Sequence, residues 1–228
     1  MLRNLFPSLV IFALALGGSY AWLQSDRTGP DTTDIAAIDT LIDVTDVQAT
    51  NGETPEVLEM FVGDENAPVT VIEYASFTCP HCARFHETVY GEIKANYVDT
   101  GKVKFIIRDV YFDRFGLWAS MLARCEPTKY FGVSDLIYTR QREWTSGESN
   151  LDVVQNLKTL GRIAGLTDEV MDACLQDNAM AQALVNEYQS NAEKDNITST
   201  PSFVIDGKNY SNMNYADFSE VLDGLVAQ

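Results

Sequence analysis

The alternation of apolar and polar residues becomes regular after residue 56 and predicts a strand, a helix and a second strand. Residues 69–75 (VTVIEYA) form a nearly continuous apolar run led by β-branched residues, which is typical of a buried central strand. Residues 82–97 predict a helix with four apolar side chains spaced four apart, at Phe85, Val89, Ile93 and Tyr97. Residues 103–110 predict the next strand, and a weaker run at 57–62 predicts an earlier one. This order favours a parallel βαβ unit with a right-handed crossover.

The middle of the chain carries helical periodicity and little strand signal. We expect five helices there, over residues 117–124, 130–141, 150–165, 167–175 and 179–194. Short strands return at 202–205 and 208–210, joined by the hairpin dipeptide Asp206-Gly207, and Asn214 predicts the start of a last helix.

These patterns predict an α/β fold with two domains. Residues 55–114 and 197–228 form the two halves of a domain with the order βαβ and ββα. Residues 115–196 form an all-helical domain inserted between those halves.

The first 23 residues indicate an export signal. Arg3 precedes an apolar run at residues 5–16, and Ser19-Tyr20-Ala21 is an acceptable small-x-small cleavage site. The alternative is an uncleaved N-terminal anchor, because residues 5–23 approach the roughly 20 residues that span a bilayer. In both cases we expect the remainder to be exported, into a compartment where disulfides persist.

Acidic residues dominate both the following segment and the whole chain. Residues 24–54 are rich in Asp and Thr, which predicts a flexible acidic linker, with a docking peptide for a partner as the alternative. The 228 residues include 16 Lys and Arg against 33 Asp and Glu, a formal net charge of −17. Such a surface repels phosphate backbones, so we expect no nucleic-acid partner.

The candidate chemistry lies in Cys79-Pro80-His81-Cys82, directly after the predicted central strand. Cys79 falls at the helix N-cap, where unpaired backbone N–H groups and the positive end of the helix dipole stabilise a thiolate. Pro80 suits the first helical position, and His81 adds a positive charge or a donor near the same sulfur. Cys82 lies one turn further in and is the natural resolving thiol of a redox-active dithiol.

Two other interpretations of these residues stay open. The two cysteines could form a structural disulfide, or they could bind a metal ion together with His86. A closed zinc site takes four ligands, and the sequence has no second Cys-x-x-Cys and no His cluster. We therefore favour the redox-active dithiol, and we expect His86 to be an exposed helix residue.

The Cys79–Cys82 sequence at a helix start, the helical insertion, and Thr200-Pro201 before a hairpin and a last helix resemble the thioredoxin-fold disulfide oxidoreductases. More narrowly they resemble the periplasmic DsbA-type branch, as does Glu73-x-x-Ser76-Phe77-x-Cys79. The resemblance covers residues 57–226. It implies a thiol:disulfide oxidoreductase that introduces disulfides into exported proteins, with the Cys79–Cys82 disulfide in place of any cofactor or metal.

The resemblance also implies a cis peptide bond at Pro201, beside the active-site sulfurs. A proline there leaves backbone groups of Thr200 free to pair with an extended substrate strand, whereas the alternative is an ordinary proline at a strand start. An apolar groove around Phe77, Thr78 and Pro201 is expected to take unfolded chains. Threonine before the proline departs from the valine of the best-known oxidase and also occurs in isomerases, so oxidase and isomerase or reductase both stay open.

The same resemblance implies partners and a location. We expect a periplasmic monomer that acts on reduced or unfolded exported proteins and is re-oxidised by a membrane quinone-linked partner similar to DsbB. Residues 25–56 are short and polar for a dimerisation domain. The alternative outside the enzymes is an anchored chaperone or a metal carrier.

Glu73 interrupts the predicted central strand. A carboxylate in such a run is unfavourable unless it is hydrated, paired or protonated. Glu73 either transfers protons for the buried Cys82 and tunes the thiol pKa, or it is a structural residue paired with a lysine.

Cys125 and Cys174 both fall in the predicted helical domain. Two leftover cysteines of one subdomain in an exported protein are expected to form a structural disulfide. A second redox relay is the alternative, although neither residue lies in a Cys-x-x-Cys sequence.

Overall fold

The computed structural model describes residues 54–227, and its centre is a five-stranded sheet in the order β1-β3-β2-β4-β5. The expectations for residues 1–23 and for nearly all of 24–54 lie outside the described residues. The strands are β1 (Met60–Val62), β2 (Val69–Ala75), β3 (Val103–Asp109), β4 (Ser202–Ile205) and β5 (Lys208–Ser211). Within the described part, no helix is both long enough and apolar enough to cross a membrane.

The pairing of β2 with β3 is parallel, which confirms the expected βαβ unit. β4 pairs antiparallel with β2, and β1 pairs antiparallel with β3. β1 is shorter than the predicted run at 57–62 because the preceding backbone bonds to a side chain instead of a strand. The carbonyl of Leu58 accepts a hydrogen bond from the Arg124 guanidinium at 2.8 Å.

The helix after β2 is longer than predicted and alternates between α and π turns. It comprises α2 (Pro80–Phe85), the π segment η1 (His86–Tyr90), α3 (Gly91–Ile93) and the π segment η2 (Lys94–Val98). The predicted apolar stripe is buried along its whole length, from Phe85 to Tyr97. A strict four-residue repeat drifts around an ideal α-helix of 3.6 residues per turn, and the wider π turns keep the stripe on one face.

Between β3 and β4 lies a helical block, residues 114–194. It contains α4 (Arg114–Arg124), the 3₁₀ turn η3 (Pro127–Lys129), α5 (Tyr130–Thr139), α6 (Gln141–Trp144), α7 (Asn150–Ile163), α8 (Asp168–Leu175) and α9 (Asn178–Lys194). Side-chain caps at Asp113, Ser149, Thr167 and Asp177 each accept the backbone N–H three residues further on. The predicted helix 130–141 is wrong in one respect, because the backbone breaks at Arg140 (φ −107°, ψ 23°) and Gln141 starts a separate helix.

The C-terminal elements match the predicted hairpin and helix. Asp206 and Gly207 both have positive φ, 48° and 81°, which is the backbone that a two-residue hairpin turn needs. α10 (Tyr215–Val226) begins at Asn214, whose side chain accepts the N–H of Asp217.

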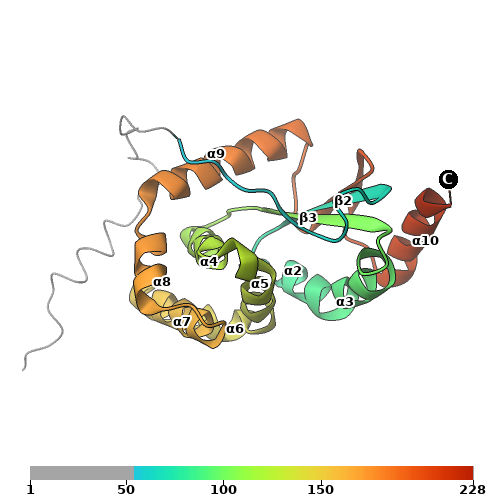
Figure 1. Ribbon diagram of the computed structural model, residues 1–228. Coiled ribbons are helices and arrows are strands. Elements are labelled where there is room, and N and C mark those ends of the chain that lie inside the picture. The colour runs from blue at the N-terminus through green and yellow to red at the C-terminus, as the bar shows by residue number, and fades with distance from the viewer. Residues whose placement is uncertain (1–53, 228) are drawn as a thin grey trace, which may run out of the picture.

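Helices cover both faces of the sheet: α9 runs across one face, while α2, α3 and α10 lie on the other (Figure 1). Neighbouring residues of β2 point to opposite layers. The hydroxyl of Tyr74 donates to the Asp195 carboxylate at the end of α9, at 2.5 Å. Glu73 points the other way, toward the layer that contains α2, where its carboxylate meets His86.

A buried carboxylate ties the helical block to the sheet. Asp109, at the end of β3, accepts hydrogen bonds from Ser120 (2.7 Å), Arg124 (3.0 Å) and Tyr130 (3.1 Å). Because all three donors belong to α4 and α5, the block is fixed at the carboxyl end of the parallel strands. A charge that is 5% exposed is tolerated there because it is paired and fully hydrogen-bonded.

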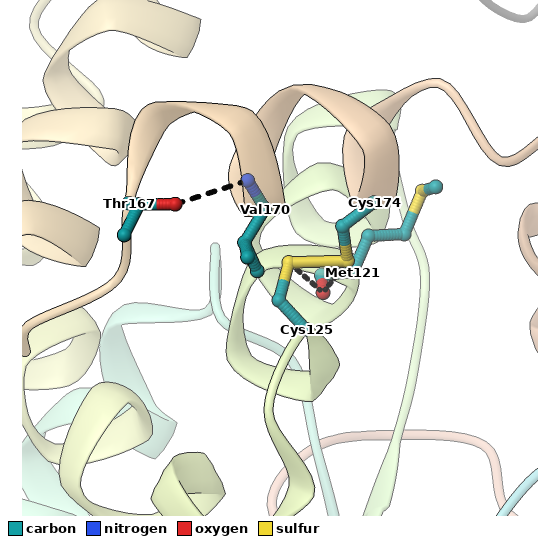
Figure 2. The surroundings of a disulfide bond; sticks show 5 residues. All are labelled: Met121, Cys125, Thr167, Val170 and Cys174. Carbon is teal, nitrogen blue, oxygen red and sulfur yellow. Dashed lines mark hydrogen bonds between the residues drawn. A yellow bond between two sulfur atoms is a disulfide. The ribbon is translucent and has the colours of Figure 1, made fainter.

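A disulfide joins Cys125, just after α4, to Cys174 in α8 (Figure 2). Their Cα atoms lie 5.6 Å apart, within the range that a disulfide requires. Thr167 caps the start of α8 through the N–H of Val170, and so orients the helix that carries Cys174. The bond therefore links the end of α4 to α8 within the helical block.

Replacing Cys125 and Cys174 together by alanine should lower the free energy of unfolding by about 4 kcal/mol, measured by urea denaturation. The disulfide closes a loop between residues 49 apart, and its loss frees the unfolded chain. A decrease below about 1 kcal/mol would contradict this structural role.

Candidate active site

The cysteines of the Cys-Pro-His-Cys sequence lie where β2 gives way to α2. Cys79 is the N-cap residue of α2 in an extended conformation (φ −81°, ψ 118°), and Pro80 occupies the first turn. Both thiols are free in the structure. Cys82 is fully buried, whereas Cys79 keeps a 9% exposure. An incoming reagent therefore meets Cys79 first.

Several donors converge on the sulfur of Cys79 and lower its pKa from 9.0 to about 5. The largest contribution is the hydrogen bond from the Cys82 thiol. Partial burial acts in the opposite direction, and Thr200 and the backbone N–H groups of Cys82 and His81 lower the pKa further. Donors of this kind favour the charged form of an acid, so Cys79 is a thiolate at neutral pH.

The surroundings of Cys82 act in the opposite sense. Burial raises the pKa of the Cys82 thiol, and the hydrogen bond to Cys79 and the negative charge of Glu73 raise it further. Cys82 therefore stays protonated at neutral pH and needs a base before it can attack a disulfide. The two thiols of one motif are chemically unequal.

The loop before β4 reaches the same sulfur. The Thr200–Pro201 peptide bond is cis, as the resemblance implies, and the Cys79 thiol donates a hydrogen bond to the carbonyl oxygen of Thr200 at 3.5 Å. The Thr200 hydroxyl is buried without a hydrogen-bond partner among the described residues, and its proximity lowers the pKa of Cys79. His81 has an exposed side chain, and it acts on the sulfur through its backbone N–H.

Phe77 does not line a groove, contrary to the expectation from the sequence. Its ring is 1% exposed and packs against Tyr138 of α5, with ring centroids 4.8 Å apart. Thr78 is partly exposed, and its hydroxyl donates to the Asp113 carboxylate at 2.8 Å. Phe77 thus belongs to the core between the active-site loop and the helical block, while Thr78 stays at the surface.

Glu73 has a partner, and the partner is His86. The carboxylate is fully buried, and its Oε2 lies 3.0 Å from His86 Nε2. The expectation of an exposed His86 is wrong: its side chain is 6% exposed and stacks on Tyr138, with ring centroids 4.1 Å apart. The other oxygen, Glu73 Oε1, is buried without a hydrogen-bond partner among the described residues.

Metal binding finds no support in these residues. His86 directs Nε2 at Glu73 instead of at the sulfurs. Across residues 54–227, no three His, Cys, Asp or Glu side chains gather into a group that could hold a metal ion.

Sequence reasoning missed Gln141, which reaches the active-site loop from α6. Its side-chain amide donates to the carbonyls of Phe77 (2.8 Å) and Cys79 (3.0 Å). No motif or spacing announces a contact between residues more than 60 positions apart. His86 did carry a signal, because it lies four residues after the buried Cys82 and therefore on the same helix face.

Comparisons with known proteins agree with this geometry. A family model described as Thioredoxin matches residues 56–224. The crystal structure of Wolbachia pipientis α-DsbA1 superimposes with a TM-score of 0.68 at 31% sequence identity, covering 76% of this chain and 93% of that one. BdbD from Bacillus subtilis shares the fold, with a TM-score of 0.66 at 20% identity over 75% of this chain and 94% of that one.

Relatives are also found at the sequence level. "Disulfide bond formation protein D" of Bacillus subtilis is 26% identical over 176 residues, 72% of this chain and 74% of that protein. "Putative protein-disulfide oxidoreductase" of Rickettsia bellii is 28% identical over 172 residues, 75% of this chain. The chain spans 65% of the length of that Rickettsia protein, and 60% of its Rickettsia prowazekii counterpart.

The thiolate absorbance of the reduced protein should titrate with a midpoint near pH 5, because the converging donors lower the Cys79 pKa to about 5. Cys82→Ala should raise this midpoint, and Cys82→Ser should raise it less, since a hydroxyl still donates. Cys79→Ser is the control that removes the transition. An ordinary midpoint near 9.0 in the wild type, or an unchanged one in Cys82→Ala, would contradict this assignment.

Proposed function

The chain belongs to the thioredoxin family, in its DsbA-like branch, and we propose that it is a thiol:disulfide oxidoreductase that introduces disulfides into exported proteins. The proposal rests on the opposite pKa shifts of the two thiols. Cys79 is stabilised as a thiolate, whereas the buried Cys82 stays protonated. The redox-active disulfide between them is the only redox group that this mechanism requires, with no metal or cofactor.

In the oxidised enzyme, a substrate thiolate attacks the sulfur of Cys79. The Cys79–Cys82 bond breaks, a mixed disulfide forms through Cys79, and Cys82 leaves with the electron pair and takes up a proton. A second substrate thiolate then attacks the substrate sulfur of the mixed disulfide and releases Cys79 as a thiolate. The substrate loses two electrons and gains a disulfide, and the enzyme ends as the dithiol.

The stability of the Cys79 thiolate sets the direction that we propose. A thiol whose pKa is about 5 is a good leaving group, and its stabilisation favours the reduced enzyme over the disulfide form. A disulfide destabilised in this way is a donor, which favours an oxidase over an isomerase or reductase. The isomerase remains the alternative, because threonine before the cis proline also occurs in isomerases of this fold.

The proposed function also requires a substrate-binding surface and a partner that re-oxidises the enzyme. The cis Thr200–Pro201 bond lies beside Cys79, and we propose that backbone groups of Thr200 pair with an extended segment of a reduced or unfolded protein. The two electrons gained must pass to an oxidant, and we propose a membrane quinone-linked partner similar to DsbB. We propose a periplasmic monomer, with residues 1–23 as its export signal or anchor.

The reduction potential of the Cys79–Cys82 pair, measured on the full chain in glutathione buffers, tests the direction. We expect about −120 mV, the value of a strong disulfide donor. A value of about −180 mV or below would replace the oxidase by an isomerase or reductase. Cys79→Ser should abolish oxidation of a reduced peptide, whereas Cys82→Ser should accumulate the mixed disulfide, and wild-type activity in either variant would refute the mechanism.

We also propose that Glu73 moves the proton that Cys82 must gain and lose. Glu73 lies close enough for its charge to raise the Cys82 pKa, and its Oε1 has no partner of its own among the described residues. His86 fixes the carboxylate through Oε2. When Cys82 attacks a mixed disulfide, its proton passes to the carboxylate, and the released substrate thiolate takes up a proton in turn.

Glu73→Gln should slow the resolution of a Cys79 mixed disulfide by Cys82 roughly 10- to 100-fold near neutral pH, because a neutral amide accepts no proton. The defect should shrink at high pH, where hydroxide deprotonates Cys82 directly. Glu92→Gln is the matched control, because Glu92 is an exposed glutamate of α3, in the long helix that also carries Cys82 and His86. A defect of equal size at every pH would argue for damaged packing instead of lost proton transfer.

A further inference from the structure

We propose that Gln141 is a positioning residue, through which the helical block holds the nucleophile Cys79 in its reactive geometry. The inference rests on the proposed function, because it assigns a role in preparing the same thiolate. Its basis is one contact: a single buried amide from α6 binds two backbone carbonyls of the active-site loop.

The two carbonyls belong to Phe77 and Cys79, on either side of Thr78. Gln141 Nε2 donates to the first at 2.8 Å and to the second at 3.0 Å, so both of its N–H groups are used. Gln141 is 8% exposed, and water has little access to replace these bonds. The loop between β2 and α2 is therefore fixed from outside, by a side chain of the helical block.

The position of the Cys79 backbone decides where its sulfur lies. Cys79 is the N-cap residue of α2, and the backbone N–H groups of His81 and Cys82 in the first turn lower the pKa of its thiol. A rotation of the Cys79 peptide moves the sulfur away from these donors. Gln141 opposes that rotation because it bonds the carbonyl of the same residue at 3.0 Å, beside the Ala83 N–H, which bonds that carbonyl at 3.2 Å.

A second contact from the block holds the neighbouring residue. The hydroxyl of Thr78 donates to Asp113 at 2.8 Å, and Asp113 also caps α4 by accepting the N–H of Gly116. The loop is thus hydrogen-bonded on its exposed side to Asp113, the N-cap of α4, and on its buried side to Gln141 of α6. Since the backbone breaks at Arg140, Gln141 lies at the start of a separate helix and reaches the loop from there.

The test replaces Gln141 by methionine, which keeps the length of the side chain but removes both donors. Gln141→Asn is the second variant, because it keeps the donors but shortens their reach and disturbs the packing less. Thr145→Val is the matched control: it removes a 2.7 Å hydrogen bond to the Gln141 carbonyl in the same helix and leaves the amide contacts in place. The readouts are the thiolate titration of Cys79 and the reduction potential, on the full chain.

We expect the thiolate midpoint to rise by about one pH unit in Gln141→Met, a tenfold loss of thiolate stability. The potential should become more negative by about 30 mV, the shift that corresponds to a tenfold change in equilibrium constant. Gln141→Asn should shift both in the same direction, and Thr145→Val should shift neither.

A wild-type midpoint in both Gln141 variants overturns this inference while leaving the proposed function standing. Equal shifts in Thr145→Val and Gln141→Met also overturn it, because they would show a general effect of weakening α6. By contrast, a wild-type protein without a lowered Cys79 pKa would refute the account of the nucleophile itself. If Gln141→Met does not fold, Gln141→Asn decides between these outcomes.

Discussion

The convergence of hydrogen-bond donors on the sulfur of Cys79 is the interaction on which the rest of the site depends. The donors are the backbone N–H groups in the first turn of α2, the thiol of Cys82, and Thr200 of the loop before β4. None of them is unusual alone. Their meeting requires β2 to end beside β4, and α2 to start where β2 ends, which is the sheet order observed. The fold thus prepares a thiolate before any substrate arrives.

The second thiol, Cys82, has the opposite requirement and must stay protonated until it reacts. Cys82 is buried beneath Cys79, where a charge is unfavourable, and Glu73 adds a negative charge beside it. The same carboxylate has one unpartnered oxygen and one held by His86. The carboxylate that raises the Cys82 pKa is the group that we propose as the proton acceptor and donor for the same thiol.

Local patterns were sufficient to predict the strands, the hairpin and the cysteine pair. β2 and β4 follow from contiguous apolar runs, and the N-cap position of Cys79 follows from one strand and one proline. Contacts across the fold were not predictable in this way. Phe77 packs inward against Tyr138, and Gln141 contacts the active-site loop because the helical block packs against that loop. Such contacts depend on tertiary packing, which a one-dimensional pattern does not encode.

The most direct test of the central claim compares the unfolding free energy of the oxidised and reduced active site, in the Cys125→Ala/Cys174→Ala background. Because the folded pKa of about 5 lies below the ordinary 9.0, the thiolate's stabilisation is complete above pH 9.0 and is lost as the pH falls toward about 5. We predict that the reduced form is the more stable one at neutral pH and loses this advantage in acid. A disulfide form that is more stable at neutral pH would contradict the account.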